Sequence, residues 1–484
     1  MSAYTHFLKH ILLPSISLCT ESRFWPLYRT LSDPETIACP ANMVYAKVAR
    51  LLKHAHESVP LYRQRMNARG LDSSSFGALE DLDKLPLITK ADIAANFPDG
   101  MTDSARSYRP WRYRSTSGTI ERLTVVHDSR KRDAARAADL LSLWFTTGYE
   151  PGMKTLEIPP DVCRNTCGSS ATQEPSLSSY FFTNLKAGRL SDAEVLSDLR
   201  GLTERQIILR KLVLNSYGNT GVAQPPEFFQ AYIDSIRRYR PHVVKALPIY
   251  LYTLALHMIE NGTTPPPITG GILPMGSSLS PHMKRIVETA FQVSVHEDYG
   301  CAELGMIGSE CGCQEGIHPF SSLFYVEVVK DGRPAAPGEL GKVVITDLMS
   351  YGMPFIRYEI GDVAVVRNGR CACGIEGPRL DLQGRLQDCL TAADGTVVSA
   401  DTVTDAILSC PEVRLFQLEA RTRNDLALKV VPMPNTEPDI TTIRRRLSRL
   451  LGQDLRISHQ FVRTILPEQG GKFRLVKNLA EVDL

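Results

Sequence analysis

Apolar positions in the first two thirds of the chain alternate between helical and extended spacing. One helix is predicted within residues 44–68, where apolar side chains recur at helical spacing until Pro60 stops it (Val48, Leu51, Leu52 and Ala55). Short apolar runs at residues 123–126 and 293–295 predict strands, the second of them buried. Helices that alternate with short strands are typical of an α/β fold.

Capping residues mark where several of these helices begin. Thr89 follows the extended run 84–90 and is suited to cap a helix that starts near Lys90. The segment 191–194 has the form of a capping box. Ser280-Pro281 is a further helix start, because proline fits the first helical position.

The pattern changes after Gly338. Strands are predicted at residues 342–346 and 355–360, in an antiparallel or barrel-like region. Beyond Gly384 the chain predicts a compact α+β unit, with strands at 415–418, 426–431 and 457–462 and an amphipathic helix between the last two (Ile440, Ile443, Leu447 and Leu450). We therefore expect an N-terminal domain over 1–385, which opens with an extension over 1–40, and a C-terminal domain over 386–484.

Composition narrows the class of protein. The chain has 484 residues, 43% of them apolar, which is enough for a large core in two or three domains. Lys and Arg total 55 against 53 Asp and Glu, so no basic excess suggests a nucleic-acid partner. The apolar run 11–19 is broken by Pro14 and is too short to span a bilayer. We expect a cytoplasmic protein without a signal peptide, and peripheral membrane contact stays open.

The cysteines predict a metal site rather than disulfides. Five of the eleven lie between residues 301 and 373, a distribution that fits a reducing compartment. Cys371 and Cys373 flank a turn, and Cys311 or Cys313 with His318 would complete the four ligands of a structural Zn²⁺. The choice between Cys311 and Cys313 stays open. Cys163 and Cys167 are interpreted as core thiols.

Two polar motifs suggest a nucleotide site. The loop Ser115-Thr116-Ser117-Gly118-Thr119 could cradle phosphate oxygens with its N–H groups and hydroxyls, although an ordinary polar turn is the favoured interpretation of so short a string by itself. Tyr299, expected at a strand end, offers a flat face to a purine, and Glu303 could hold Mg²⁺. The alternative is a buried tyrosine with a surface glutamate.

Three single residues are weaker candidates by themselves. Asp362 follows the predicted strand 355–360 and could accept hydrogen bonds from a ribose diol, although aspartate there is often a turn residue. Arg385 lies at the expected domain junction, and Lys472 lies on a glycine-flanked loop that could swing into a site. A solvated basic tail is the alternative for Lys472.

Together, the order of these motifs resembles the adenylate-forming superfamily of acyl-CoA synthetases, luciferases and adenylation domains. Within it the chain resembles the phenylacetate–CoA ligase and coenzyme F390 synthetase group from about residue 40 onward. The resemblance is most specific in a helix followed by Val-Pro-x-Tyr-Arg and Leu-Pro-x-x-x-Lys, in the segments 297–303 and 338–362, and in the cysteine cluster.

The resemblance implies a fold and a set of residue roles. The fold is α/β: a large domain with two β-sheets, helices and a small barrel-like region, and a small mobile C-terminal α+β domain. Ser115 to Thr119 would hold phosphates, Glu303 would bind Mg²⁺, and Lys472 would bridge the acid and the α-phosphate. The remaining roles are adenine binding (Tyr299, Gly300, Gly276, Ser277, Ser278), ribose binding (Asp362, Arg385), the acid pocket (Pro248, Ile249, Tyr250) and a hinge (Asp388).

The implied activity is ATP-dependent activation of a small-molecule carboxylic acid with Mg²⁺, followed by transfer to coenzyme A. An acyl carrier protein's phosphopantetheine or an amine is an alternative acceptor, and the chain would act as a monomer or homodimer. The segment Ile120-Glu121-Arg122 departs from the family's phosphate loop, which favours a specialised substrate or, alternatively, a catalytically impaired, zinc-stapled nucleotide binder. A zinc-dependent nucleic-acid binder is disfavoured by the near-neutral charge.

Overall fold

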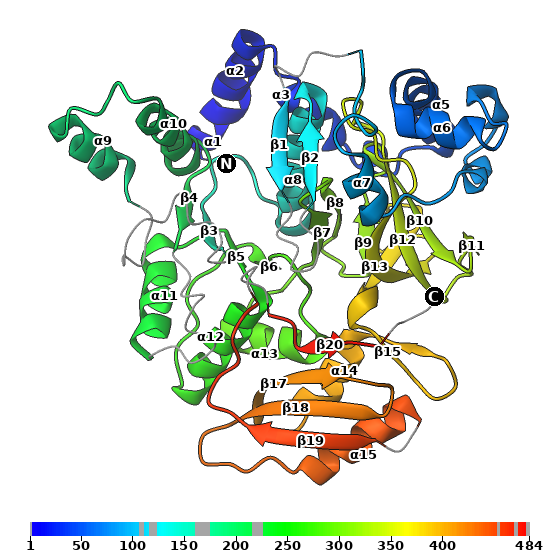
Figure 1. Cartoon of the computed structure of the whole chain (residues 1–484). Coiled ribbons are helices and arrows are strands. Elements are labelled where there is room, and N and C mark those ends of the chain that lie inside the picture. Colours follow the sequence, from blue (N-terminus) through cyan, green and yellow to red (C-terminus); the bar gives the residue numbers. More distant parts are fainter. Residues whose placement is uncertain are drawn as a thin grey trace. The chain divides into compact units, whose positions relative to one another are not determined.

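The computed structural model describes residues 2–105, 111–115, 123–159, 175–214, 226–452, 455–468 and 473–480 (Figure 1). The chain divides into two compact units. Unit 1 comprises residues 1–13, 147–297 and 390–480, and unit 2 comprises 14–146, 298–389 and 481–484. Residues 390–480 thus group with part of the preceding chain, and the division at 385/386 into two domains stays a prediction.

Unit 1 contains a four-stranded parallel sheet in the order β4-β3-β5-β6. Its strands are β3 (Thr155–Ile158), β4 (Lys211–Val213), β5 (Val243–Ala246) and β6 (Gly271–Pro274). The helices of this part are α9 (Leu177–Lys186), α10 (Ala193–Leu202), η4 (Thr203–Ile208), α11 (Pro226–Tyr239), α12 (Pro248–Glu260) and α13 (Pro281–Phe291). Leu156, Val244 and Ile272 of the strands share a buried core with residues of α11, α12 and α13. This is the predicted α/β arrangement.

The first helices of the chain pack on this part of unit 1. They are α1 (Ala3–Phe7) and η1 (Leu8–Leu12), and Leu8 is fully buried. Gly152 has a φ of +93°, and a Cβ there would lie 2.8 Å from Leu8 Cδ1. Glycine at position 152 therefore lets the N-terminal segment approach closely.

The C-terminal part of unit 1 is a four-stranded sheet in the order β19-β18-β17-β20, covered by two helices (Figure 1). Its elements are β17 (Val413–Ala420), β18 (Asp425–Pro432), β19 (Arg456–Phe461), β20 (Val476–Asn478), α14 (Ala400–Leu408) and α15 (Ile440–Leu451). A two-stranded ribbon, β15 (Leu390–Thr391) and β16 (Val397–Val398), precedes them. The three predicted strands and the amphipathic helix are present, and β20 was not predicted.

Two carboxylates of α14 contact the start of α13. Asp401 Oδ2 accepts a hydrogen bond from Ser278 Oγ at 3.3 Å, and the Asp405 carboxylate accepts one from the backbone N–H of His282 at 3.0 Å. Burial raises the pKa of Asp401 from 3.8 to about 6, and the charge of Asp405 adds to this rise. The ionised form of Asp401 is therefore disfavoured in the folded chain.

The substitution Asp401→Asn is expected to stabilise the protein at pH 7.5. The folded chain binds the Asp401 proton more tightly than the unfolded chain, so stability from this group is lost as pH rises from about 4 to about 6. Asparagine keeps an acceptor for Ser278 without the charge. The gain should approach about 3 kcal/mol above pH 6, the equivalent of two pKa units, and vanish near pH 4.

Urea unfolding at both pH values measures this gain. Asp394→Asn is the control, because the Asp394 carboxylate is exposed and accepts a hydrogen bond from the Thr396 N–H at 2.9 Å. A loss of stability in Asp401→Asn at pH 7.5 would mean that the carboxylate is favourably ionised in the folded chain.

Unit 2 is built on an eight-stranded antiparallel sheet in the order β11-β10-β12-β13-β14-β9-β8-β7. Its strands are β7 (Asp298–Cys301), β8 (Gly305–Glu310), β9 (Ile317–Pro319), β10 (Phe324–Lys330), β11 (Arg333–Pro334), β12 (Leu340–Asp347), β13 (Tyr358–Arg367) and β14 (Arg379–Arg385), followed by η6 (Leu386–Asp388). A separate hairpin, β1 (Arg112–Ser115) and β2 (Thr124–His127), leads into the long helix α8 (Ser129–Thr147).

The remaining helices precede the hairpin in the sequence. They are α2 (Leu13–Thr20), α3 (Phe24–Leu31), α4 (Pro34–Ile37), α5 (Ala41–Ser58), α6 (Pro60–Asn67), η2 (Ser73–Ser75), η3 (Glu80–Lys84) and α7 (Lys90–Asn96). Among the described residues, no helix combines the length and the apolar character needed to cross a bilayer.

Helix starts were predicted better than strand limits. Thr89 caps α7 with a capping box, and Ser280 caps α13 with Pro281 at its first turn. Pro60 begins the second of two helices, because Val59 is extended between them. The predicted buried strand 293–295 is reduced to a single parallel bridge, in which the buried Val295 pairs with Ile272 of β6. The predicted strand 355–360 instead begins at Tyr358 and continues to Arg367.

Candidate nucleotide and metal sites

Tyr299, Asp362 and Arg385 meet in unit 2. The Tyr299 hydroxyl donates to Asp362 Oδ2 at 2.9 Å, and Arg385 Nε lies 2.9 Å from Asp362 Oδ1. Asp362 pairs with Arg385 across β13 and β14, next to a bulge. Tyr299 and Asp362 were both expected at strand ends, but Tyr299 lies within β7 and Asp362 lies within β13. Three residues that are distant in the sequence therefore form one polar cluster.

This cluster shows how strongly the sheet curves. Strands β7 and β13 are four places apart in the strand order, which would separate them by about 19 Å in a flat sheet. The hydrogen bond between Tyr299 and Asp362 requires the sheet to curl on itself, as expected for a barrel-like region. Burial and the Asp362 carboxylate raise the pKa of Tyr299 well above its usual range, so its hydroxyl stays protonated and donates.

Glu303 lies in the turn between β7 and β8 and is only 4% exposed, which excludes the alternative of a surface glutamate. Tyr358 donates its hydroxyl to Glu303 Oε1 at 3.3 Å, and Lys90 Nζ lies 3.8 Å from the same oxygen. Burial and the Glu303 charge raise the pKa of Tyr358 well above its usual range, so this hydroxyl is a neutral donor. The carboxylate is thus held in a fixed, charged environment.

Only the first residue of the predicted phosphate loop, Ser115, lies among the described residues. Ser115 ends β1 and pairs with Thr124 of β2. Thr116, Ser117, Gly118 and Thr119, with Ile120 to Arg122, lie outside the described residues. At the far end of β2, His127 Nε2 lies 2.8 Å from the carbonyl oxygen of Glu303. The hairpin and the Glu303 turn are therefore neighbours within unit 2.

Two further candidate segments follow parallel strands of unit 1. Gly276, Ser277 and Ser278 come after β6, and Gly276 has a φ of +79°. Pro248, Ile249 and Tyr250 begin α12 directly after β5. In open α/β sheets, ligands bind beyond the carboxyl ends of the strands, which is where both segments lie.

Tyr250 also connects the predicted acid pocket to the C-terminal segment. Its ring packs edge-on against Phe473, with the ring centroids 6.3 Å apart. Lys472, which directly precedes Phe473, lies outside the described residues, as do Cys163 and Cys167. The predicted hinge residue Asp388 ends η6, three positions after Arg385.

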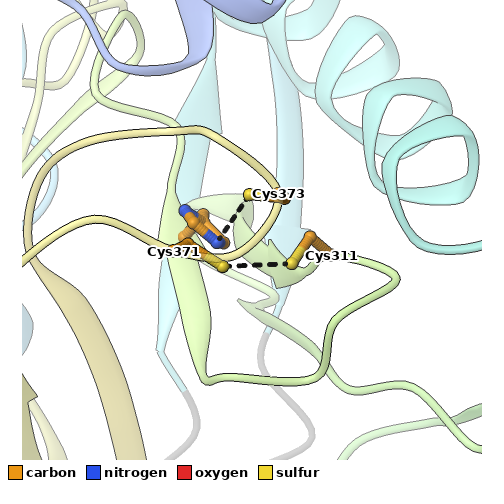
Figure 2. A group of neighbouring side chains, drawn as sticks. Cys311, Cys371 and Cys373 are labelled. Carbon is orange, nitrogen blue, oxygen red and sulfur yellow. Dashed lines mark hydrogen bonds between the residues drawn. The ribbon is translucent and has the colours of Figure 1, made fainter.

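The predicted metal ligands come together in unit 2 (Figure 2). The ligand atoms of Cys311, His318, Cys371 and Cys373 all lie within 4.8 Å of one another. Cys311 Sγ is 3.6 Å from Cys371 Sγ, and Cys373 Sγ is 3.7 Å from His318 Nε2. Cys313 is exposed and outside this group. Of the two candidates that the sequence left open, the geometry therefore favours Cys311.

Polar contacts around the group orient the loop that carries Cys371 and Cys373. Arg379 pairs with Glu315 at 2.6 Å, and the Glu315 carboxylate accepts the Ala372 N–H at 3.3 Å. Burial lowers the pKa of His318 to about 4, so its imidazole is neutral at pH 7, as metal ligation requires. Burial raises the pKa of the Cys311 thiol, a shift that a bound cation would reverse.

Sequence reasoning missed the residues around Glu303. Lys90 was noted only as the expected start of a helix and as the last position of a resemblance motif, without a chemical role. His127, Lys131 and Tyr358 gave no local signal, because each contacts the Glu303–Leu304 turn across 55 to 176 positions. Only the rarity of a histidine on an apolar strand could have drawn attention to His127.

Known proteins of similar sequence are phenylacetate–coenzyme A ligases. That of Thermus thermophilus is 25% identical over 489 residues, covering 92% of this chain and 99% of the relative. That of Escherichia coli is 25% identical over 427 residues, covering 85% of this chain and 87% of the relative. No protein-family model matches the chain.

Solved structures extend the comparison to the fold. A 2-hydroxyisobutyryl-CoA ligase in the postadenylation state, in complex with 2-HIB-AMP, has a TM-score of 0.68 at 19% identity, with 92% of this chain and 91% of that chain covered. The same enzyme in an open conformation gives a TM-score of 0.56. The resemblance drawn from the sequence is thereby confirmed: the chain has the fold of the adenylate-forming enzymes and is similar along nearly its whole length to their phenylacetate–CoA ligase group.

Proposed function

We propose that this protein activates a carboxylic acid with ATP, through an acyl-adenylate, and transfers the acyl group to the thiol of coenzyme A. The observation that carries the proposal is the convergence of Tyr299, Asp362 and Arg385 in one cluster of unit 2, in which the hydroxyl of a buried tyrosine donates to a carboxylate that is paired with an arginine. The similarity to the Thermus thermophilus phenylacetate–CoA ligase over 92% of the chain supports the same reaction.

The first half-reaction joins two anions. A carboxylate oxygen attacks the α-phosphorus of ATP, the new P–O bond forms, and the bond to the β-phosphate breaks to release pyrophosphate. Electrostatic repulsion and charge on the phosphoryl oxygens dominate this barrier. In the second half-reaction the thiol attacks the acyl carbon, the thiol proton is lost, and AMP leaves.

The described residues suit the nucleotide's parts. Tyr299 would stack on adenine, and Asp362 would accept the ribose hydroxyls, with Arg385 holding its other oxygen. Glu303 would bind the Mg²⁺ on the phosphates, because a buried carboxylate is a hard oxygen ligand for that ion. Lys90, 3.8 Å from Glu303, adds a cation at the same place.

Other assignments rest on the resemblance. The residues 115–119 would hold the phosphates, Gly276 to Ser278 would line the adenine pocket, and Pro248 to Tyr250 would line the acid pocket. Lys472 would bridge the acid and the α-phosphate, and Asp388 would act as the hinge for movement of the C-terminal domain.

We further propose that Cys311, His318, Cys371 and Cys373 bind a structural Zn²⁺. Three thiols and one imidazole are a common closed ligand set for that ion, and the four ligand atoms already lie close together. A closed set leaves no open position for substrate, so the ion would serve stability rather than catalysis.

The test is pyrophosphate release with ATP, Mg²⁺ and a panel of aryl, acyl and amino acids, followed by mass analysis after coenzyme A is added. We expect at least one acid to give pyrophosphate and an acyl-CoA product. ATP binding without pyrophosphate from any acid would favour an impaired nucleotide binder. An acyl-adenylate that a carrier protein or an amine consumes, but coenzyme A does not, would change the acceptor.

The substitution Asp362→Asn is expected to raise the KM for ATP by about 10- to 100-fold, since hydrogen bonds to a charged group contribute roughly 1.5–3 kcal/mol. The matched control is Asp381→Asn. Asp381 pairs with Arg367 across the same two strands, at their exposed end, 2.5 Å away. Equal effects of the two substitutions would remove Asp362 from the nucleotide site.

A further inference from the structure

We propose that Lys131 and His127 are positioning residues that fix the backbone of the Glu303 turn and thereby aim its carboxylate at Mg²⁺. The inference deepens the proposed function and rests on the role proposed there for Glu303. His127 ends β2 and Lys131 lies in the first turn of α8, and both contact the turn between β7 and β8.

The two side chains hold consecutive carbonyl groups. His127 Nε2 donates to the carbonyl oxygen of Glu303 at 2.8 Å, and Lys131 Nζ donates to that of Leu304 at 2.6 Å. Hydrogen bonds to two successive peptide groups restrict the backbone rotation that would turn the Glu303 side chain away. Outer contacts of this kind commonly tune metal affinity by orienting the ligand.

His127 makes its contact as a hydrogen-bond donor. A carbonyl oxygen can only accept, so Nε2 of the ring carries a proton and donates to Glu303. The same contact is made whether or not Nδ1 also carries a proton.

Burying the charged Lys131 side chain costs desolvation energy that a purely structural role would not require. It is 1% exposed, pairs with the fully buried Asp347, and places its ammonium 4.7 Å from the centre of the Phe324 ring. Desolvation of such a pair often cancels its Coulomb energy, and apolar residues of similar volume would stabilise a core at least as well. Lys131 Nζ also donates to the Leu304 carbonyl oxygen, which an apolar side chain could not do.

Hydrogen bonds and a close backbone approach also hold α8 against the Glu303 turn. The Asp128 carboxylate accepts the Lys131 N–H at 2.8 Å and the Gly352 N–H at 2.8 Å, which fixes the first turn of α8. Gly305 has a φ of +76°, and a Cβ there would lie 3.3 Å from that of Ala135 on α8. The helix thus forms a rigid support directly behind the turn.

The experiment compares two variants with a control. The double variant Lys131→Met with Asp347→Asn removes the ammonium group without leaving a buried charge. The Met349 N–H donates to Asp347 Oδ1 at 2.9 Å, and asparagine keeps an oxygen that can accept this hydrogen bond. His127→Met removes the ring donor, and His127→Gln restores one. Ser142→Ala is the control, since it breaks a buried hydrogen bond of 2.7 Å to Ser309 that joins α8 to β8 away from the turn.

Two measurements decide the proposal. Amide hydrogen exchange of residues 302–306 should become at least about tenfold faster in the double variant and in His127→Met, but not in Ser142→Ala. The Mg²⁺ concentration for half-maximal pyrophosphate release should rise by about 10- to 100-fold in the same variants, and His127→Gln should recover most of it.

The outcomes separate this proposal from the proposed function. A wild-type protein that releases no pyrophosphate contradicts the proposed function, while the exchange measurement still decides whether Lys131 and His127 fix the turn. Unchanged exchange at 302–306, or a Mg²⁺ requirement that shifts equally in Ser142→Ala, overturns the positioning role. A lower melting temperature with unchanged hydrogen exchange and unchanged Mg²⁺ dependence would mean that Lys131 and His127 stabilise the core but do not position the turn.

Discussion

Replacing Cys371 and Cys373 with serine is expected to abolish zinc binding and to lower the melting temperature by roughly 10 °C. The two thiols lie between β13 and β14, whereas Cys311 follows β8 and His318 lies on β9. An ion held by all four residues would connect segments about 60 positions apart in the sequence, as the contact of Cys311 with Cys371 shows. Without the ion, those segments lose this cross-link.

The size of the effect follows from the energetics of such sites. Structural Zn²⁺ contributes about 10–16 kcal/mol in zinc-finger peptides, which have little other core. Unit 2 has an extensive core of its own, so a loss of a few kcal/mol is the appropriate scale, and each kcal/mol shifts the melting temperature by about 2–4 °C in a unit of this size. Pyrophosphate release by the folded fraction at 25 °C should change little, because the ion has no open position for substrate.

Elemental analysis and thermal unfolding measure these changes. Cys313→Ser is the matched control: its thiol is exposed, two residues from Cys311, and outside the group. It should retain one Zn²⁺ per chain, while Cys311→Ser should lose it. Loss of the metal from the Cys313 variant but not from the Cys311 variant would reverse the assignment, and a wild-type protein that binds no zinc would refute the site.

The contrast between the metal cluster and the Glu303 turn shows what sequence can reveal. Cysteine is rare and chemically specific, so two close pairs with a histidine predicted a metal site despite their separation. A lysine in a helix is usually solvated, and nothing near Lys131 in the sequence indicates that it is buried beside Asp347. Its role becomes visible only when the fold brings residues 131, 304 and 347 together.

Strand positions illustrate a second limit. Asp362 was expected after a strand, because a Gly-Asp pair normally marks a turn. In the structure Gly361 has a φ of +89°, and the register of β13 against β14 shifts just after Asp362. The irregularity is accommodated inside the sheet, where a bulge re-aims the side chain toward Tyr299 and Arg385. Local composition cannot distinguish such a bulge from a chain reversal.

Replacing Lys472 with alanine is expected to slow adenylation by about 10²–10³-fold and to leave the second half-reaction nearly unchanged. A cation is needed where the carboxylate meets the α-phosphate, and one preorganised electrostatic contact is worth that much in rate. Thiol attack on the acyl-adenylate has no such encounter of two anions. The loss should therefore appear in pyrophosphate release but not in acyl-CoA formation from a synthetic acyl-adenylate.

A lysine nearby provides the control for this prediction. Lys477 lies five positions further along, on β20, and pairs with Glu468 at 2.9 Å. Lys477→Ala removes the same charge from the same segment and should leave both half-reactions within a few-fold of wild type. Equal slowing of both half-reactions by Lys472→Ala would indicate a folding defect or a role in binding coenzyme A. Undiminished pyrophosphate release would mean that the repulsion between ATP and the acid is offset by other cations, of which Lys90, 3.8 Å from Glu303, is the first candidate.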